Sequence, residues 1–299
     1  MDLSLLQERF QKEGLAIGLG TGGLPVVALR NEFGAVTVSL YGAHVLSYTT
    51  AAGEPVLWLS DKAVFERSKP IRGGVPVCWP WFGAHQQDSE KPAHGFARIC
   101  EWELLDAHSG ENAEGGWIEL RLVDSQQTRA LWPYPFELIY RVSLGRDGLR
   151  LTLRTQNKGA EAFSVTTALH SYFGLASIDA ASVLGLEGVD YLDQLDDLSR
   201  KTQEGLVKFD REVDRIYVNA PSKTWIDGAI SGRRIEIQSQ GSRSTVVWNP
   251  WIDKAKRMSD FGDTEYKEML CVETANAGPD AIVVSPDQAH ELEVLLKLL

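Results

Sequence analysis

The sequence predicts an all-β protein with a few short helices. Many short apolar runs alternate with a period of two residues and are bounded by glycine and polar turn residues, which is typical of β-strands. The chain shows no strand–helix–strand alternation and no glycine-rich phosphate-binding motif. Because neither a linker nor a repeat divides it, residues 1–299 are predicted to form one domain of two packed, mostly antiparallel sheets.

The first part of the chain is predicted to begin with a helix within residues 1–14 and to continue as strands. Leu3, Leu6 and Phe10 have helical spacing, and Gly14 ends the pattern. Strands are predicted at 26–29, 35–40, 44–48 and 55–59, followed by one helical turn at 61–65.

Residues 69–83 combine prolines and glycines with large aromatic side chains. The prolines and glycines exclude long regular structure. Trp79, Trp81 and Phe82 are nevertheless too apolar for a solvated linker. We therefore expect this loop either to pack as a lid or to line a pocket. Residues 84–91 resemble an exposed polar loop.

The strand pattern resumes after residue 98, with a hairpin turn predicted at Arg146-Asp147-Gly148. Residues 190–209 are the most polar stretch and are expected to be a solvated excursion, whereas 249–261 is predicted to contain a short helix. The further strands are predicted at 99–105, 117–122, 137–144, 149–156, 161–168, 233–238, 244–248, 269–273, 281–285 and 292–298.

Composition narrows the class of partner and compartment. The formal net charge of -11 makes binding to nucleic acid through its phosphates unfavourable, but a few local arginines can still hold a small anion. The three cysteines are far apart and form neither a disulfide framework nor a Cys-x-x-Cys pair. The chain has no basic, apolar leader and no apolar run long enough to span a membrane. A cytoplasmic protein is expected.

Three separate segments supply groups suited to acid–base chemistry. His94 lies in Pro92-Ala93-His94-Gly95-Phe96-Ala97-Arg98, His170 in a second segment and Glu273 in a third. An imidazole and a carboxylate can exchange protons near neutral pH. Two histidines and one carboxylate could also form a facial triad for iron or zinc, although ligand histidines on a β scaffold are often closer in sequence.

Six segments, in order, resemble the hexose-6-phosphate mutarotase (glucose-6-phosphate 1-epimerase) family within the aldose 1-epimerase group. They are IRGG (71–74), HGFAR (94–98), LHSYF (169–173), VDRIY (213–217), VWNPW (247–251) and VETAN (272–276). The resemblance extends from about residue 34 to the C-terminus. It implies the galactose-mutarotase-like β-supersandwich fold.

The resemblance also implies an activity, the interconversion of the α and β anomers of a hexose 6-phosphate, with glucose 6-phosphate the expected substrate. The anomeric hydroxyl loses a proton while the ring oxygen gains one, so the ring opens and can close as the other anomer. By resemblance, Glu273 is the base and His170 the acid. This chemistry requires neither a metal nor a redox cofactor, and none is expected.

The remaining site residues are assigned to substrate binding. By resemblance, Asp214 holds sugar hydroxyls, and His94 either binds the sugar or shares in charge stabilisation. Arginine suits a phosphate because its planar fork donates two parallel bonds. The substrate-binding candidates are Arg72, His94, Arg98, Asp214, Trp81, Trp251 and Lys254. Ala93 stands where some family members have glutamine, which leaves the preferred hexose phosphate open.

Two other functions remain as alternatives. A non-catalytic carbohydrate-binding module would need only the aromatic, aspartate and arginine side chains. A glycosidase usually needs two carboxylates flanking the bond, and Asp214 is the only carboxylate besides Glu273 in the six segments. A monomer is expected. The other histidines, His44, His85, His108 and His290, are assigned to the surface or to packing.

Overall fold

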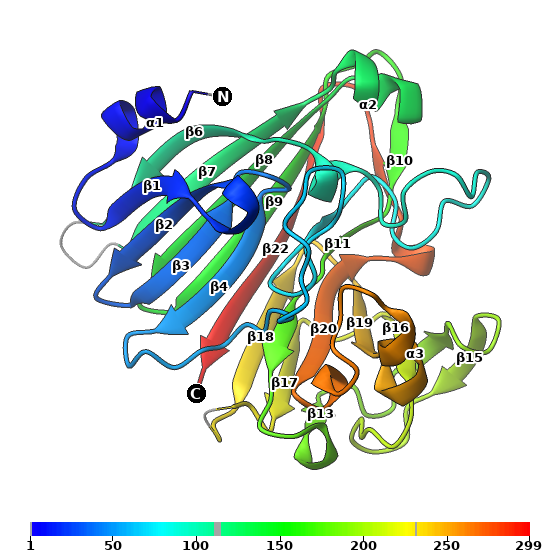
Figure 1. Cartoon of the computed structure of the whole chain (residues 1–299). Helices are drawn as coiled ribbons and strands as arrows, with labels where there is room; N and C mark the ends of the chain where they lie inside the picture. Colours follow the sequence, from blue (N-terminus) through cyan, green and yellow to red (C-terminus); the bar gives the residue numbers. More distant parts are fainter. Residues whose placement is uncertain (1, 111–114, 231) are drawn as a thin grey trace.

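The computed structural model describes residues 2–110, 115–230 and 232–299, and its chain is built mainly of antiparallel strands (Figure 1). The prediction of an all-β protein with few helices is confirmed. The α-helices are α1 (Leu3–Phe10), α2 (Gln126–Leu131) and α3 (Trp251–Arg257). The leading helix thus lies within the predicted range 1–14, and Met1 lies outside the described residues.

The strands are distributed over four hydrogen-bonded sheets, two of which have eight strands. We call the first eight-stranded sheet the front sheet. In spatial order it contains β15 (Ser199–Thr202), β14 (Asp190–Asp193), β16 (Val213–Val218), β19 (Ser244–Asn249), β20 (Met269–Asn276), β11 (Thr167–Leu169) and β5 (Val77–Cys78), with β12 (Tyr172–Gly174) paired to β20.

The second eight-stranded sheet, the long sheet, contains β13 (Ser182–Leu184), β17 (Lys223–Asp227), β18 (Ile235–Gln240), β22 (Ala289–Leu298), β9 (Gly148–Asn157), β8 (Phe136–Gly145), β7 (Gly116–Val123) and β6 (Glu103–His108). A four-stranded sheet contains β1 (Leu15–Leu19), β2 (Pro25–Asn31), β3 (Gly34–Ser39) and β4 (His44–Thr50), and a small sheet pairs β10 (Phe163–Val165) with β21 (Ile282–Val284).

Alternation along β8 and β9 shows why these residues form strands. Buried and half-buried positions alternate without interruption over ten residues of each strand, so one face packs inward. The predicted hairpin turn joins them, with Gly145 opposite Gly148. Gly148 has φ +117°, and a Cβ there would lie 2.2 Å from the Leu296 carbonyl oxygen. Only glycine fits this turn without a shift of the neighbouring strand.

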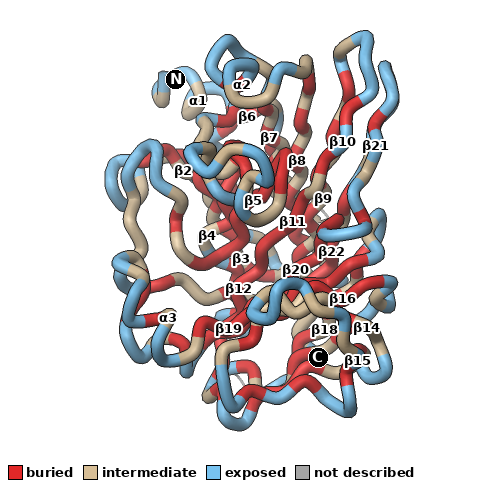
Figure 2. The backbone as a smooth tube through the Cα atoms, turned by 90° about the vertical axis from the view of Figure 1, so that its right-hand side faces the viewer, coloured by how far each residue is buried: buried red, intermediate tan, exposed pale blue. Residues whose placement is uncertain are grey.

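Both the four-stranded sheet and the front sheet contact the long sheet. The four-stranded sheet contacts it at β7 and β8, and β20 of the front sheet contacts β22 (Figure 1). One apolar cluster includes Val38, Val247 and Leu296, one residue from each of these three sheets. Figure 2 shows the resulting buried interior where β20, β11, β9 and β22 lie.

The strand predicted at 55–59 is reduced to isolated bridges at Pro55, Leu57 and Leu59, and three further predicted elements were wrong. Residues 61–65 form a turn at 61–62 followed by irregular chain instead of a helical turn, and Glu265 holds the start of this segment by accepting from Ser60 Oγ (2.7 Å) and the Asp61 N–H (2.8 Å). The strand predicted at 99–105 begins only at Glu103, because a 3₁₀ turn over Ala97–Ile99 precedes it.

The third error concerns residues 190–209, which are not simply solvated. They contain the hairpin of β14 and β15 at the edge of the front sheet. Lys201 pairs with Asp193 and Asp196, each at 2.8 Å, and the Tyr191 ring packs 5.3 Å from that of Tyr217. An edge hairpin has few buried positions, so its sequence resembles that of a loop.

Several short elements had no clear sequence pattern. β1, β12, β13 and β17 have three to five residues each, and α2 depends on a capping box between Ser125 and Thr128. In the proline-rich loop, Trp79 is fully buried against Phe136, with 4.4 Å between ring centroids. Among the described residues, no helix has the length and apolar character needed to cross a membrane.

Candidate active site

The front sheet brings the acidic and aromatic residues of three strands to one face. Asp214 lies opposite Trp248 in the β16–β19 ladder, and Val246 lies opposite Glu273 in the β19–β20 ladder. Opposed residues share a face, and so do residues two apart on one strand. Asp214, Trp248 and Glu273 therefore project from the same side of the sheet.

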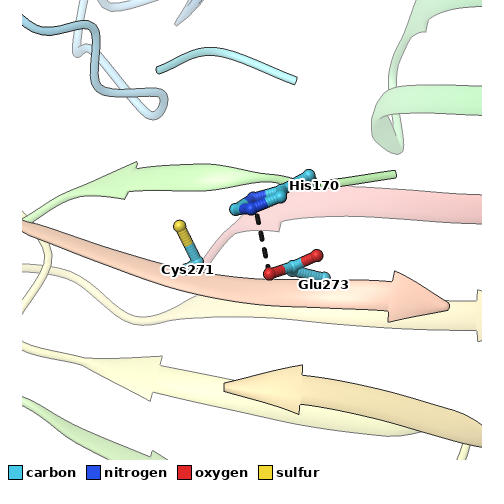
Figure 3. A group of neighbouring side chains, drawn as sticks. All are labelled: His170, Cys271 and Glu273. Atoms are coloured by element: carbon cyan, nitrogen blue, oxygen red, sulfur yellow. Dashed lines mark ion pairs between the residues drawn. The ribbon is translucent and has the colours of Figure 1, made fainter. Parts of the chain in front are cut away.

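His170 joins this face from the end of β11. Ala168 lies opposite Ala275, so His170, two residues later, continues on the same side. Its backbone N–H donates to the Pro76 carbonyl at 3.1 Å, which fixes the chain where β11 ends. The Nδ1 atom of His170 lies 3.4 Å from Oε1 of Glu273, and both side chains are buried (Figure 3). His170 and Glu273, which are 103 residues apart in the sequence, are thus in direct contact.

A cavity of about 340 Å³ opens over this pair. It contains seven of the nine residues that the sequence predicted for the site: His170, Glu273, Arg72, His94, Arg98, Asp214 and Lys254. Gln194, Trp248, Phe82 and Met258 also line it. The volume suits one small polar ligand.

Trp81 and Trp251 do not line this cavity. The Trp81 indole N–H donates to the Pro92 carbonyl at 2.9 Å, and its ring packs on His85 and Phe96. Trp251 begins α3 and packs on Tyr266. A sugar-stacking role for these two tryptophans is therefore not supported by their positions. Trp248, three residues before Trp251, is the tryptophan that faces the cavity.

Arg72 is held in place by two partners. Its Nε and Nη2 donate to the carboxylate of Asp260 at 3.2 and 3.3 Å, and its Nη1 donates to the Tyr172 hydroxyl at 3.1 Å. Each terminal nitrogen carries two hydrogens, so one N–H on each remains for a ligand. Gly73, the residue after Arg72, accepts a hydrogen bond from His44 Nε2 at 2.7 Å, which fixes the loop that carries Arg72.

The loop with His94 and Arg98 is fixed by backbone geometry. Gly95 has φ +71°, and a Cβ there would lie 2.0 Å from the Trp79 carbonyl oxygen, so glycine is required. His94 Nδ1 accepts from the Gly83 N–H at 3.3 Å, which leaves Nε2 as the donor in the neutral ring. Arg98 donates to the Ala93 carbonyl at 2.8 Å. Among the described residues, no carboxylate lies within ion-pair distance of Arg98.

Lys254 on α3 closes the opposite side of the cavity. Its Nζ lies 2.9 Å from Glu212 and 3.6 Å from Asp214. Gln194, in the β14–β15 turn, donates from Nε2 to Asp214. Burial raises the pKa of Asp214 to about 6, although Lys254 and Gln194 act in the opposite direction. Asp214 is thus held in place by two partners at the cavity.

The surroundings of the His170–Glu273 pair disfavour charge on both groups. Burial, with a smaller contribution from Asp214, raises the pKa of Glu273 well above its usual value. Burial, together with His94, Arg98 and Arg72, lowers the pKa of His170 well below its usual value. In the empty site the pair therefore holds one proton, with a carboxylic acid beside a neutral imidazole. Glu273 Oε2 and His170 Nδ1 are buried and lack hydrogen-bond partners.

Comparison with known proteins identifies the family. The model of the aldose 1-epimerase family matches residues 25–297. This chain belongs to the aldose 1-epimerase family. A protein of Cenchrus ciliaris named as a candidate glucose-6-phosphate 1-epimerase is 40% identical over 264 residues, which cover 85% of this chain and 78% of that protein.

Solved structures agree with the epimerase fold. A Salmonella typhimurium protein described as a candidate mutarotase superposes with a TM-score of 0.86 at 30% identity, covering 97% of this chain and 96% of its own. A galactose mutarotase related enzyme from Lactobacillus acidophilus has a TM-score of 0.72 at 15% identity, covering 91% and 96%. The predicted galactose-mutarotase-like fold is confirmed.

This aldose 1-epimerase family member contains one group of side chains, among those described, that could hold a metal ion. The ligand atoms of His170, Cys271 and Glu273 lie within 4.8 Å of one another (Figure 3). The set differs from the two histidines and carboxylate considered from the sequence, because Cys271 replaces His94. Burial raises the pKa of the Cys271 thiol well above its usual value, so the thiol is protonated when no metal ion is bound.

The family motifs did not reveal every residue that lines the cavity. Gln194 lies in the polar stretch that was expected to be solvated, and Met258 follows α3. Neither has a neighbouring motif. The sequence does contain a signal for Trp248. It lies near the end of a predicted strand, just before Asn249 and Pro250, and period-two alternation places it on the same face as Val246.

Proposed function

We propose that the protein interconverts the α and β anomers of a hexose 6-phosphate, with glucose 6-phosphate as the substrate. The observation that carries this proposal is the 3.4 Å contact between His170 and Glu273 at the base of a sugar-sized cavity that also presents Arg72, Arg98 and Lys254. The name of the 40% identical relative supports the same substrate.

The short distance between the two groups suits the reaction. The anomeric oxygen and the ring oxygen are bonded to the same carbon, C1, so the base and the acid must act close together. Glu273 takes the proton of the anomeric hydroxyl while His170 gives a proton to the ring oxygen. The C1–O5 bond breaks and C1–O1 becomes a carbonyl. After rotation about C1–C2, the reverse proton transfers close the ring as the other anomer.

The protonation of the empty pair matches the middle of this cycle. Ring opening converts a carboxylate and an imidazolium into a carboxylic acid and a neutral imidazole. Burial favours this same neutral combination at Glu273 and His170. This agreement is what a catalyst that stabilises its intermediate requires.

The cations and polar groups around the pair orient the substrate. Arg98, which lacks a carboxylate partner among the described residues, and the two free N–H groups of Arg72 bind the phosphate. Asp214 accepts from sugar hydroxyls, and His94 Nε2 donates to one. Trp248 offers a face for the apolar side of the sugar ring.

The setting of the reaction is proposed from the sequence. The three cysteines are free, which fits a reducing compartment, so we place the protein in the cytoplasm. The net charge of -11 is unfavourable for nucleic-acid binding. We propose that the protein acts as a monomer, since one chain supplies every residue of the site.

The test is anomer-exchange NMR on glucose 6-phosphate and on glucose, with the Glu273→Gln protein as a matched control. We expect wild type to accelerate exchange of the phosphorylated sugar far more than that of glucose, and the variant to accelerate neither. Equal acceleration of both sugars would refute the phosphate assignment. Binding of glucose 6-phosphate without acceleration would instead identify a non-catalytic carbohydrate-binding module.

A further inference from the structure

Tyr172 lies directly behind the cavity and contacts both halves of the site. It belongs to β12, two residues after His170, and is almost completely buried. It is not among the residues that line the cavity. A role in the reaction can therefore come only through the residues it touches.

Its ring forms a close parallel stack with the imidazole of His170. The ring centroids lie 4.7 Å apart, and the planes differ by only 6°. Trp58 stacks against Tyr172 at 5.9 Å, and Trp248 contacts both His170 and Tyr172 edge-on at 6.1 and 6.0 Å. The imidazole is thus held by an aromatic wall, and Tyr172 is the only member of it that stacks in parallel on His170.

The hydroxyl of the same side chain reaches the other half of the site. It accepts a hydrogen bond from Arg72 Nη1 at 3.1 Å, while Asp260 occupies the other edge of the guanidinium. Tyr172 therefore joins a cation placed for the phosphate to the acid placed for the ring oxygen. The backbone reinforces the link, since the Tyr172 N–H donates to Gly74, two residues after Arg72, at 2.9 Å.

We propose that Tyr172 is a positioning residue that couples phosphate binding at Arg72 to the orientation of His170. This inference rests on the proposed function. A phosphate that engages Arg72 fixes the guanidinium and, through the hydroxyl, the phenol ring. The ring then holds the imidazole at the angle needed to meet the ring oxygen. Its π face also stabilises the imidazolium that donates the proton.

The other groups near His170 do not provide this link. The titratable and charged groups that surround it are Glu273, Cys271, His94, Arg98 and Arg72. Of these, the positive charges of Arg98 and Arg72 disfavour the imidazolium. Tyr172 offers a stabilising surface without charge, so its removal changes the acid without changing the net charge of the site.

The experiment compares Tyr172→Phe, which keeps the ring, with Tyr172→Leu, which removes both contacts. Tyr140→Phe is the matched control, because Tyr140 is also fully buried, lies in β8 and has a hydroxyl without a partner. Exchange kinetics are measured on glucose 6-phosphate and glucose as a function of pH. The native fold of each variant is checked by circular dichroism.

Distinct results are expected for the two contacts. Tyr172→Phe raises KM for glucose 6-phosphate several-fold, with kcat nearly unchanged and no effect on glucose, because only the hold on Arg72 is lost. In an Arg72→Ala background the same change has no further effect on KM. Tyr172→Leu lowers kcat roughly 3- to 30-fold, which is the range of a cation–π contact. It also shifts the limb of the pH profile that belongs to the His170 imidazole to lower pH.

Two results would overturn the inference. One is a Tyr172→Phe protein with wild-type KM for glucose 6-phosphate. The other is a folded Tyr172→Leu protein whose kcat and pH limb match those of Tyr140→Phe. If Tyr172→Leu does not fold, the KM comparison with the Arg72→Ala background decides. A wild type that accelerates no exchange would refute the proposed function itself, a separate outcome.

Discussion

Glu273 and His170 hold a single proton between two buried groups, and this defines what each substitution should do. Glutamine at position 273 keeps the size of the side chain but cannot accept the anomeric proton. Asparagine at 170 cannot donate to the ring oxygen. Each of Glu273→Gln and His170→Asn is expected to lower catalysed anomer exchange roughly 10²- to 10⁴-fold.

These variants should keep the wild-type fold, because each replacement is similar in size and, among the described residues, Glu273 Oε2 and His170 Nδ1 have no hydrogen-bond partner to lose. Exchange NMR measures the rate, and thermal unfolding checks the fold. A variant that unfolds at the wild-type temperature and retains full activity would remove that residue from the mechanism.

The pH dependence of kcat/KM follows from the same pair. Only the state with one proton is active. Burial lowers the pKa of His170, so the second proton is gained well below pH 6.5, and it raises the pKa of Glu273, so the last proton is lost well above pH 4.5. The profile should be bell-shaped, with a plateau wider than the two free side chains would give.

Measurement of kcat/KM between about pH 4 and 10 tests this expectation. A single limb at the ordinary pKa of glutamate or of histidine would show that the two groups titrate independently and that burial does not control them. The Glu273→Gln protein should lose the alkaline limb.

At the residue scale, the sequence could predict which residues belong to the site but not where their side chains point. His170, Glu273 and four binding candidates came from the motifs and do line the cavity, and Lys254, chosen from outside the motifs, lines it too. Trp251 came from a motif and Trp81 from the aromatic loop at 69–83, and neither lines the cavity, because a sequence pattern records which residues are near in sequence and not which way a side chain turns. Trp251, for instance, has φ 55° at the start of α3, and that backbone conformation directs it towards Tyr266.

At the scale of elements, β4 supports the loop that carries Arg72. His44, the first residue of β4, is fully buried, and its Nδ1 has no partner while Nε2 donates to Gly73. Burial lowers the pKa of His44 to about 4. The unfolded chain therefore binds more protons than the folded one between about pH 6.5 and pH 4. Stability from this group is fully present above pH 6.5 and is lost as the pH falls.

His44→Gln tests this contribution, because glutamine can donate to Gly73 but does not titrate. Between pH 7.5 and 4.5 wild type should lose about 2 kcal/mol more of its free energy of unfolding than the variant does. Urea unfolding at the two pH values measures the difference. Equal losses in the two proteins would mean that His44 does not remain neutral in the folded state.

Element prediction succeeded where burial on one side produced a long alternation and failed where it did not. β8 and β9 were found with their turn because ten residues of each alternate. The β14–β15 hairpin was missed because most of its side chains are only partly buried and lie at a sheet edge. Since Gln194 lies in that hairpin, the error in the element also concealed a cavity residue.

At the scale of the whole molecule, one apolar cluster extends through the four-stranded, front and long sheets. The other two apolar clusters among the described residues are small, with six buried residues around the front sheet and three around Tyr41. We therefore propose that the chain is a single domain and expect one cooperative unfolding transition. Circular dichroism reports the strands, and tryptophan fluorescence reports Trp248 in the front sheet, Trp117 and Trp225 in the long sheet and the tryptophans of the loops.

Coincident urea transitions by these two probes, without a plateau, are the expected result. Separate midpoints would divide the chain into at least two independently stable parts. That outcome would refute the single domain predicted from residues 1–299, although the family assignment would be unaffected.

The ion pairs at the edge of the cavity have a consequence for competition inside a cell. Arg72 already lies 3.1 Å from Asp260, and Lys254 lies 2.9 Å from Glu212. Of the three cations that line the cavity, Arg98 alone has no carboxylate neighbour among residues 2–110, 115–230 and 232–299, so inorganic phosphate would find one unpaired cation. Inorganic phosphate and other anions that carry no sugar should therefore inhibit only weakly. A high cellular concentration of such anions should leave the site available to the sugar phosphate.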